Sequence, residues 1–261
     1  MKTQFKLVAL LLTSFISLFI GLAPVPALAL TNLTASDFSN LSQSDVNAVI
    51  QLTALGTTHR AYAGASPLGI TGFDFGVDLV GIPLPSQVTN ALSLATGQPI
   101  ANIPTLIPLP KVNLHKGLPG RIDVGLSFLS YQNLFTTWGG DIKWTILGGL
   151  AAPALAVRGN ATYSQLYFIT THTYSLDVVV SKNLFIIDPY LGAGLEFWSG
   201  DLLAPISGPG FSTNVSAHTN GMNPHLYAGF PLKLILLKLT PEVDYSTSGL
   251  LTYGGKLSIA F

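Results

Sequence analysis

Short segments in which apolar and polar residues alternate recur along most of this chain. From Arg121 to Tyr131 one set of alternate positions holds Ile122, Val124, Leu126 and Phe128, and the other holds Arg121, Asp123, Gly125 and Ser127. A period of two residues is that of a β-strand whose two faces meet different surroundings. A slip of one residue would exchange the faces and move the charges to the apolar side. The pattern therefore predicts strands of fixed register.

The same alternation recurs in further segments. They span residues 73–79, 141–146, 155–163, 174–181, 190–197, 225–234, 238–246 and 251–261. A tenth, shorter strand is predicted near 110–116. Residues 182–186 and 234–238 form short turns, whereas 82–109 and 199–221 form long loops at the opposite end of the strands. Both chain ends should lie on the side of the short turns, so the number of strands should be even. This favours about 10 strands, within a range of about 8–12.

Composition indicates what surrounds the apolar faces. Charged residues make up 9% of the chain and apolar residues 48%, whereas an ordinary soluble domain carries about 25% charged residues. A soluble β-sandwich also alternates, but its wet faces should carry more charge. Beyond the N-terminus no stretch offers about 18 uninterrupted apolar residues, so crossing a bilayer requires a closed barrel. We expect an all-β fold, a transmembrane antiparallel up-and-down β-barrel with a short N-terminal helix.

The first 29 residues have the features of an export signal. Lys2 and Lys6 precede an apolar run over residues 7–22, and Ala27-Leu28-Ala29 supplies a cleavage site, so the mature chain is expected to begin at Leu30. A retained membrane anchor is the alternative, because the apolar run is only a little shorter than the ~20 residues that span a bilayer. We divide the chain into a signal peptide (1–29), an N-terminal helical segment (30–65) and the barrel (66–261).

The charge balance argues against nucleic acid as a partner, and the lack of cysteine excludes stabilisation by disulfides. The chain has 12 basic and 12 acidic residues and no cysteine. Without Lys2 and Lys6, 10 basic residues stand against 12 acidic ones, so no basic field exists for nucleic acid. Without cysteine the exported protein has no disulfides to hold it.

The last residues carry a resemblance. Tyr253-Gly254-Gly255-Lys256-Leu257-Ser258-Ile259-Ala260-Phe261 resembles the C-terminal signal by which Gram-negative outer-membrane barrels are recognised by their assembly machinery, with Tyr253, Leu257, Ile259 and Phe261 as its alternate apolar positions. The resemblance implies integral insertion in a bacterial outer membrane. Its partners would be outer-membrane lipid, lipopolysaccharide and the assembly machinery.

Three internal segments carry a narrower resemblance. His115-Lys116-Gly117-Leu118-Pro119, the run from Gly139 to Lys143 and the run from Ala154 to Gly159 resemble an uncharacterised family of bacterial outer-membrane proteins. That resemblance implies the fold over much of the chain and no established activity.

Two segments outside the strands are informative. Ser44-Asp45 is expected to cap a helix to about Leu55, which plugs the lumen, caps the barrel from the periplasm or packs on its rim. Residues 57–65 continue it or add a strand. The 82–109 loop is apolar and rich in proline, with a short helix over 86–95. It is expected to dip into the lumen or lie on the membrane surface.

The lumen-facing positions carry near-balanced charge. The predicted set is Asp74, Asp78, Arg121, Asp123, Asp141, Lys143, Arg158, Asp177, Glu196, Lys233, Lys238, Glu242, Asp244 and Lys256. Such charges must be paired or hydrated. A packed ion-pair network that keeps a narrow barrel rigid is favoured over a hydrated pore, since large open porins need 16 or more strands.

The sequence shows no convincing catalytic constellation. His218-Thr219-Asn220-Gly221 distantly resembles the His and Ser neighbourhood of outer-membrane lipid A deacylases, but Asn220 stands where that resemblance requires serine. The five histidines show no short metal-ligand spacing, so most are expected in loops or at the rim, with no metal and no cofactor. They are His59, His115, His172, His218 and His225.

Three functions remain open. The first is passage or uptake of small molecules across the outer membrane, with a small hydrophobic ligand as a candidate because of the apolar loop. The second is a closed structural or interaction barrel without transport. A lipid-modifying enzyme is a remote third, and we expect no enzyme. If Leu126 faces lipid at mid-depth, arginine there should cost about 2–4 kcal/mol, and arginine at Ser127 should cost less.

Overall fold

The computed structural model describes residues 42–96, 99–103, 105–131, 135–148, 152–208, 211–234 and 236–261. The predicted signal peptide, residues 1–29, lies outside the described residues, as does the beginning of the predicted N-terminal segment. No helix in the described parts is long and apolar enough to span a membrane.

Ten antiparallel strands of the described chain close into an up-and-down barrel, as predicted. They are β1 (Phe73–Pro83), β2 (Leu106–Leu118), β3 (Ile122–Tyr131), β4 (Phe135–Leu147), β5 (Ala154–Leu166), β6 (Ile169–Ser181), β7 (Tyr190–Gly208), β8 (Phe211–Gly229), β10 (Leu237–Ser246) and β11 (Leu251–Ala260). β11 pairs with β10 and with β1, in a register that joins Asp74 to Ala260 and Gly81 to Tyr253. A three-residue strand, β9 (Leu232–Leu234), adds to one end of β10. A closed sheet has no edge, so the ladder satisfies the backbone in lipid.

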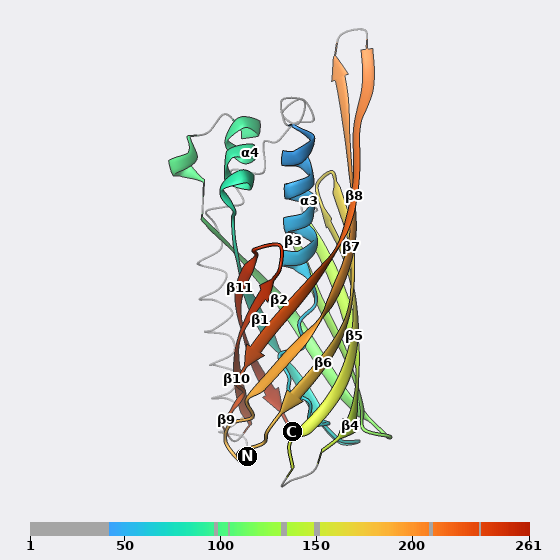
Figure 1. Cartoon of the computed structure of the whole chain (residues 1–261), viewed down its shortest axis with the longest axis vertical. Coiled ribbons are helices and arrows are strands. Elements are labelled where there is room, and N and C mark those ends of the chain that lie inside the picture. The colour runs from blue at the N-terminus through green and yellow to red at the C-terminus, as the bar shows by residue number, and fades with distance from the viewer. Residues whose placement is uncertain are drawn as a thin grey trace.

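The two ends of the barrel differ (Figure 1). At the lower end in this view Phe261 lies beside the start of β1, and the backbone nitrogen of Phe73 donates to the oxygen of Phe261 over 2.8 Å. At the upper end lie α3 (Gln43–Thr57), α4 (Ser86–Thr96), the short helix η2 (Ile100–Asn102) and a β7–β8 hairpin that extends beyond the other strands. We call these the lower and upper ends.

The structure corrects two predicted boundaries. Residues 199–221, predicted as a long loop, are mostly strand, because β7 and β8 stay paired out to Gly208 and Phe211. Backbone hydrogen bonds within a hairpin do not require apolar and polar side chains to alternate, so the alternation in the sequence ends before the strands do. The short strand near 110–116 is the 13-residue β2. Pro108 and Pro110 lack the backbone N–H of a ladder residue, which weakened its signal.

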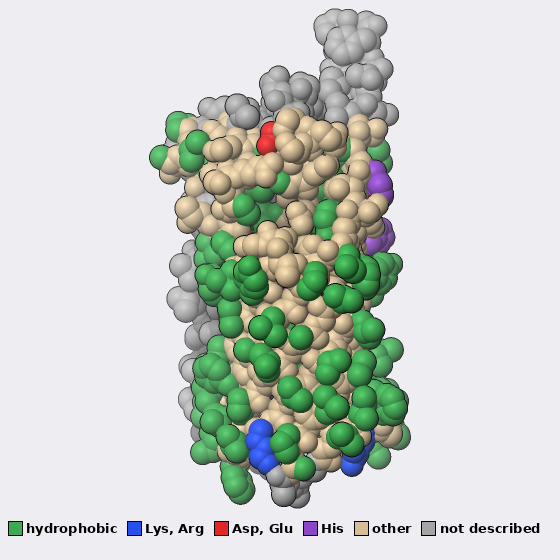
Figure 2. Space-filling view, viewed as in Figure 1, with side chains coloured by type: hydrophobic (Ala, Val, Ile, Leu, Met, Phe, Trp, Pro, Cys, Tyr) green, Lys and Arg blue, Asp and Glu red, His purple; other side chains and the backbone are tan. Residues whose placement is uncertain are grey.

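The faces of the barrel follow the alternation. Along β6, Thr171, Thr173, Ser175 and Asp177 are buried, whereas Tyr174, Leu176 and Val178 are more than half exposed. Figure 2 shows hydrophobic side chains spread over the body of the barrel, with Lys and Arg side chains of this face near the lower end. The outer side is apolar and the lumen side is largely polar, apart from an apolar cluster in its upper part, which fits a surrounding bilayer.

Helix α3 begins with a capping box. The Ser42 side chain accepts from the Asp45 backbone, and the Asp45 side chain accepts from the Ser42 backbone. The cap therefore lies two residues before the predicted Ser44. The helix lies within the upper part of the barrel (Figure 1). It packs against apolar side chains of the wall. The apolar cluster around it comprises Val46, Ile50, Ala54, Leu55, Tyr62, Val80, Ile82, Leu109, Ile169, Trp198, Leu202 and Leu250.

Below α3 the chain continues as an extended strand-like stretch inside the barrel. Ala61, Tyr62 and Ala65 are 3% exposed or less, although this stretch joins no sheet. The sequence left a plug, a periplasmic cap and a rim position open for this segment, and the structure places it in the lumen. We call residues 42–68 the lumen segment.

The apolar 82–109 stretch divides among β1, α4, η2 and β2. Its ends belong to β1 and β2, where Ile82 and Leu109 join the cluster around α3. Between them α4 buries Val88 and Ala91. The Gln87 amide donates to the Ser44 carbonyl over 3.2 Å and so joins α4 to the beginning of α3. The stretch therefore packs at the mouth of the barrel against the lumen segment.

Candidate functional site

Wall side chains hold the backbone of the lower lumen segment from several sides. Lys111 of β2 donates to the Thr58 carbonyl over 3.0 Å, and Asn113 of the same strand donates to the Arg60 carbonyl over 3.0 Å. On β5, Thr162 accepts from the backbone nitrogen of His59 over 2.8 Å. An irregular stretch cannot satisfy its own backbone, so the wall supplies these partners.

Further down, the same pattern continues. Lys143 of β4 donates to the carbonyls of Gly64 and Ser66, each over 2.8 Å, and Thr145 donates to the Ala65 carbonyl over 2.6 Å. The Ala65 backbone nitrogen donates to Ser181 of β6 over 3.0 Å. The segment is thus bonded to neighbouring strands of the wall between β2 and β6.

Two wall glycines show how closely the segment approaches. A Cβ at Gly139 would lie 2.7 Å from the Cβ of His59, and one at Gly254 would lie 2.2 Å from the Tyr62 hydroxyl. Any side chain there would displace the lumen segment. The wall is therefore shaped around this segment as well as bonded to it.

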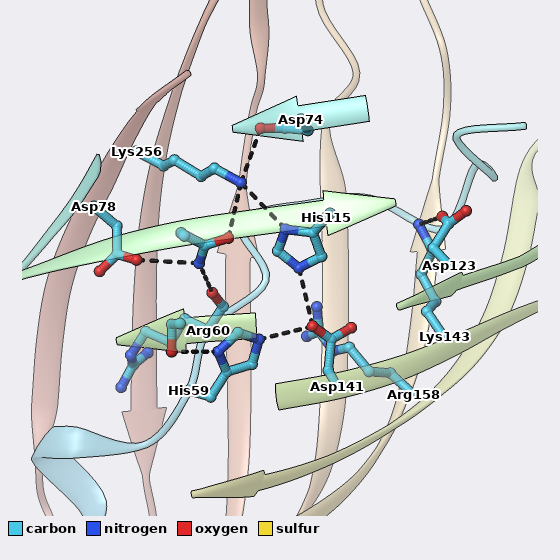
Figure 3. Close-up of polar contacts among 12 residues, drawn as sticks. His59, Arg60, Asp74, Asp78, His115, Asp123, Asp141, Lys143, Arg158 and Lys256 are labelled. Atoms are coloured by element: carbon cyan, nitrogen blue, oxygen red, sulfur yellow. Dashed lines mark hydrogen bonds and ion pairs between the residues drawn. The ribbon is translucent and has the colours of Figure 1, made fainter. Parts of the chain in front are cut away.

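A first side-chain cluster joins His59 to the wall (Figure 3). His59 Nε2 and His115 Nε2 lie 2.7 and 2.9 Å from the same oxygen, Asp141 Oδ1. The other ring nitrogens contact Ser127 Oγ at 2.7 Å and Lys256 Nζ at 3.3 Å. The carboxylate can only accept, so both Nε2 atoms donate to it.

A second cluster forms around Arg60. Its guanidinium lies 2.8 Å from Asp244 and 3.8 Å from Glu242. His225 bridges two carboxylates, at 3.2 Å from Asp244 and 3.0 Å from Asp177. These five residues line a cavity of about 10 Å³, roughly room for one water.

Neighbouring ion pairs extend both clusters. Arg158 pairs with Asp177 at 3.3 Å and contacts the Tyr227 hydroxyl. Asp74 pairs with Lys238 and, at 2.9 Å, with Lys256. Many of the buried charges of the described interior are thus paired, and the cavity around Arg60 leaves little free volume there.

Most of the residues predicted to line the lumen lie buried in it. They are Asp74, Asp78, Asp123, Asp141, Lys143, Arg158, Asp177, Glu196, Lys238, Glu242, Asp244 and Lys256. Two lie elsewhere. Arg121 is exposed in the turn between β2 and β3, with a φ of 63°, because the strand begins one residue later than the alternation suggested. Lys233 lies in β9 outside the ten-strand ladder, where its side chain is 39% exposed and pairs with Asp188 at 3.8 Å.

The prediction that most of the five histidines lie in loops or at the rim was wrong. His59, His115 and His225 are buried in the lumen rather than at a loop or rim. His115 and His225 stand in phase with the polar positions of their strands, a signal that metal-ligand spacing does not use. Nothing in the periodicity placed His59 or Arg60, because both lie in the irregular segment.

His218 and the C-terminal strand lie away from these clusters. His218 Nδ1 contacts Asp201 Oδ1 at 2.8 Å on the exposed face of the β7–β8 hairpin, 58% and 49% of the two side chains being exposed. Tyr253 and Phe261 are exposed on the outer surface, and the Phe261 ring stacks on that of Phe73.

At the upper end, the Ser42 side chain holds the pKa of Asp45 below its ordinary value through a hydrogen bond.

The closed ladder and the apolar outer surface around a largely polar interior are those of a β-barrel that spans a membrane. The protein is an integral β-barrel of a bacterial outer membrane. No protein-family model matches the chain, and no curated protein matches it. The narrower resemblance to an uncharacterised family therefore stays a prediction.

Solved structures similar to the chain include several outer-membrane barrels. The N-terminal barrel domain of Pseudomonas aeruginosa OprF shares 10% identity over 74% of this chain and 99% of that one, with a TM-score of 0.33. Neisserial surface protein A shares 9% identity over 73% and 97%, with a TM-score of 0.29. The translocator domain of the Neisseria meningitidis autotransporter NalP shares 7% over 84% and 94%, with a TM-score of 0.37.

Proposed function

We propose that this protein works as a closed outer-membrane barrel, which passes no solute while the lumen segment is in place. One observation carries this proposal. The segment is bonded to side chains of β2, β3, β4, β5 and β6, which are consecutive in the wall, and to Asp244 of β10 across the lumen from them. What remains beside it around Arg60 is a cavity of about 10 Å³, which is too small for any solute larger than water.

A closed barrel of this kind acts through its surfaces. Its apolar belt contacts outer-membrane lipid and, in the outer leaflet, lipopolysaccharide. Its upper end carries the longer connections, which lie on the extracellular side of such barrels, so α4 and the long β7–β8 hairpin would face the exterior. Binding of another molecule at this end is the activity that the architecture favours.

A gated passage is the second candidate, and the chemistry of the contacts favours it. The lower lumen segment is held through polar groups that water can replace, and the wall behind it carries charges. If the segment moved, a narrow hydrophilic path would open. Such a path suits small polar solutes better than the hydrophobic molecules suggested by the apolar loop, because that stretch packs against α3.

A disulfide lock separates the two candidates. Ser66 and Ser181 have hydroxyl oxygens 3.5 Å apart, one on the segment and one on β6, and the chain contains no other cysteine to interfere. We expect the double variant Ser66→Cys/Ser181→Cys to cross-link on oxidation. Ion conductance and liposome swelling are then measured before and after reduction. A closed barrel gives neither in either state, whereas a gated passage conducts only when reduced.

The matched control is Ser130→Cys/Thr136→Cys, whose parent hydroxyls lie 3.2 Å apart on the exposed faces of β3 and β4. This pair joins wall to wall and leaves the lumen segment free. Steady conductance through the oxidised Ser66→Cys/Ser181→Cys protein would reveal a path past the segment and would overturn the closed barrel.

The assembly machinery remains a proposed partner through the terminal strand. Deleting Phe261 should reduce the amount of heat-modifiable barrel in the membrane while secretion to the periplasm continues. The comparison variant is Phe185→Ala, since that side chain is 95% exposed in a lower turn. Normal barrel abundance without Phe261 would contradict the proposal.

We also propose that the exposed His218 serves no catalysis. Its side chain contacts the carboxylate of Asp201, which could orient it as a base, but Asn220 stands where a serine nucleophile would be required. His218→Ala should leave lipid A and phospholipid profiles unchanged. A changed profile would revive the lipid-modifying enzyme.

A further inference from the structure

Three metal-ligating side chains from three separate elements meet in the lumen. His59 comes from the lumen segment, His115 from β2 and Asp141 from β4 (Figure 3). One ligand atom of each lies within 4.8 Å of the others, and all three side chains are buried. The short spacing sought in the sequence is absent because the fold, and not the local chain, brings the ligands together.

The donor set indicates the kind of ion. Two imidazole nitrogens and one carboxylate oxygen suit Zn²⁺, and a hard cation such as Mg²⁺ or Ca²⁺ prefers oxygen alone. Three protein ligands leave a fourth tetrahedral position for water.

We propose that Zn²⁺ binds between His59 Nε2, His115 Nε2 and Asp141 and ties the lumen segment to the wall. Ser127, 2.7 Å from His59 Nδ1, orients that ring in the way outer partners orient zinc-binding histidines. The site rests on the closed lumen proposed above, because His59 must lie in the barrel. A bound Zn²⁺ would strengthen the closure of the lumen by holding the segment to the wall.

Proton balance identifies the group that opposes binding. Both Nε2 atoms carry the proton that Asp141 accepts, and each must lose it to present a lone pair. On His59 the proton moves to Nδ1, where the Ser127 hydroxyl can accept it. On His115 the Nδ1 position faces the Lys256 ammonium at 3.3 Å, which cannot accept. Lys256 must give up its own proton to solvent or turn away.

Lys256 has other partners to turn toward. It lies 2.9 Å from Asp74 and 3.0 Å from Asn113. Removing the Lys256 charge should favour Zn²⁺ binding, because a positive charge near the ion and a donor facing His115 Nδ1 both disappear. Lys256→Met is expected to tighten Zn²⁺ binding by about tenfold or more. Asp74 keeps Lys238 as a partner in that variant.

The experiment titrates ZnCl₂ into the refolded full-length protein in detergent, against a chromophoric chelator. We expect one ion per chain. His59→Ala and Asp141→Asn should each weaken binding by about 100-fold or more, which exceeds the usual effect of losing an outer partner. Asp141→Asn keeps the size of the side chain, so it serves if His59→Ala does not fold. The double variant His172→Ala/His218→Ala, outside this cluster, should bind as the parent does.

Thermal unfolding supplies a second measurement. Zn²⁺ should raise the midpoint for the parent and the His172→Ala/His218→Ala control, and leave His59→Ala unchanged. Binding that survives His59→Ala, or that disappears in the control, would overturn the site. If the Ser66→Cys/Ser181→Cys cross-link forms but no stoichiometric Zn²⁺ binds, this inference fails and the closed barrel stands. If the cross-link does not form, the lumen position itself is wrong.

Discussion

The upper and lower parts of the lumen are filled by the same segment in different ways. In the upper part α3 packs Val46, Ile50 and Leu55 against apolar side chains of the wall. In the lower part the extended stretch presents its backbone and charged side chains to lysines, threonines and carboxylates. The upper contacts are non-directional, whereas each lower contact depends on one geometry.

The difference bears on how each part tolerates change. A lost methyl group in the upper part leaves a cavity, which neighbours partly fill. A lost partner in the lower part leaves a buried polar or charged group with nothing to pair with. The lower part should therefore be the more sensitive to substitution and the more selective for one arrangement.

The largest effect is expected from an added charge in the lower part. Ser127 is buried and contacts His59, so Ser127→Arg would place a guanidinium where the lumen segment lies. We expect little folded barrel, measured as the heat-modifiable fraction after refolding. Leu126→Arg, whose site is 63% exposed on the outer face, is the control and should cost about 2–4 kcal/mol. A milder result for Ser127→Arg than for Leu126→Arg would contradict the lumen position of the segment.

Removing Arg60 should rank second. Arg60→Ala breaks the buried pair with Asp244, and breaking such a pair costs about 3–5 kcal/mol in the free energy of unfolding. Urea unfolding in lipid vesicles measures it. Arg121→Ala is the matched control, because Arg121 is exposed in a turn and should change the free energy by less than about 0.5 kcal/mol. Equal effects for the two arginines would mean that the Arg60 cluster does not hold the segment.

The upper part is probed by Ile50→Ala. Ile50 is fully buried beside Gly200, and truncating a buried isoleucine costs about 2–5 kcal/mol, depending on how far the site collapses. The same urea titration applies, with the exposed Gln43→Ala as control. A cost at the upper limit, above that of Arg60→Ala, would reverse the proposed order of sensitivity.

The smallest effect is expected at the beginning of α3. Ser42→Ala removes the hydroxyl that accepts from the Asp45 backbone, and such caps contribute about 1 kcal/mol. The pKa of Asp45 should rise toward its ordinary value, since the lowered pKa depends on Ser42. NMR titration of Asp45 checks this. An unchanged Asp45 pKa in the variant would show that the capping box does not form in the protein.

Leu126 and Ser127 illustrate what the sequence could predict and what it could not. Alternation put Leu126 outside and Ser127 inside, and both faces are as predicted. It also predicted arginine at Ser127 to be the milder change. From the structure we expect the opposite order, because Ser127 contacts His59 and an arginine there would meet the lumen segment.

The sequence by itself determined the closed barrel, about ten strands and the identity of twelve buried lumen charges, since strand periodicity and sparse charge are properties of the chain read residue by residue. Only the tertiary structure placed residues 42–68 in the lumen and brought His59, His115 and Asp141 together. The irregular segment has no period to read, and its position is set by bonds to side chains that lie 53 to 184 residues away in the chain. Such distant partners leave no local pattern in the sequence. The sequence therefore predicted which charged residues line the lumen, but not which of them pair with one another.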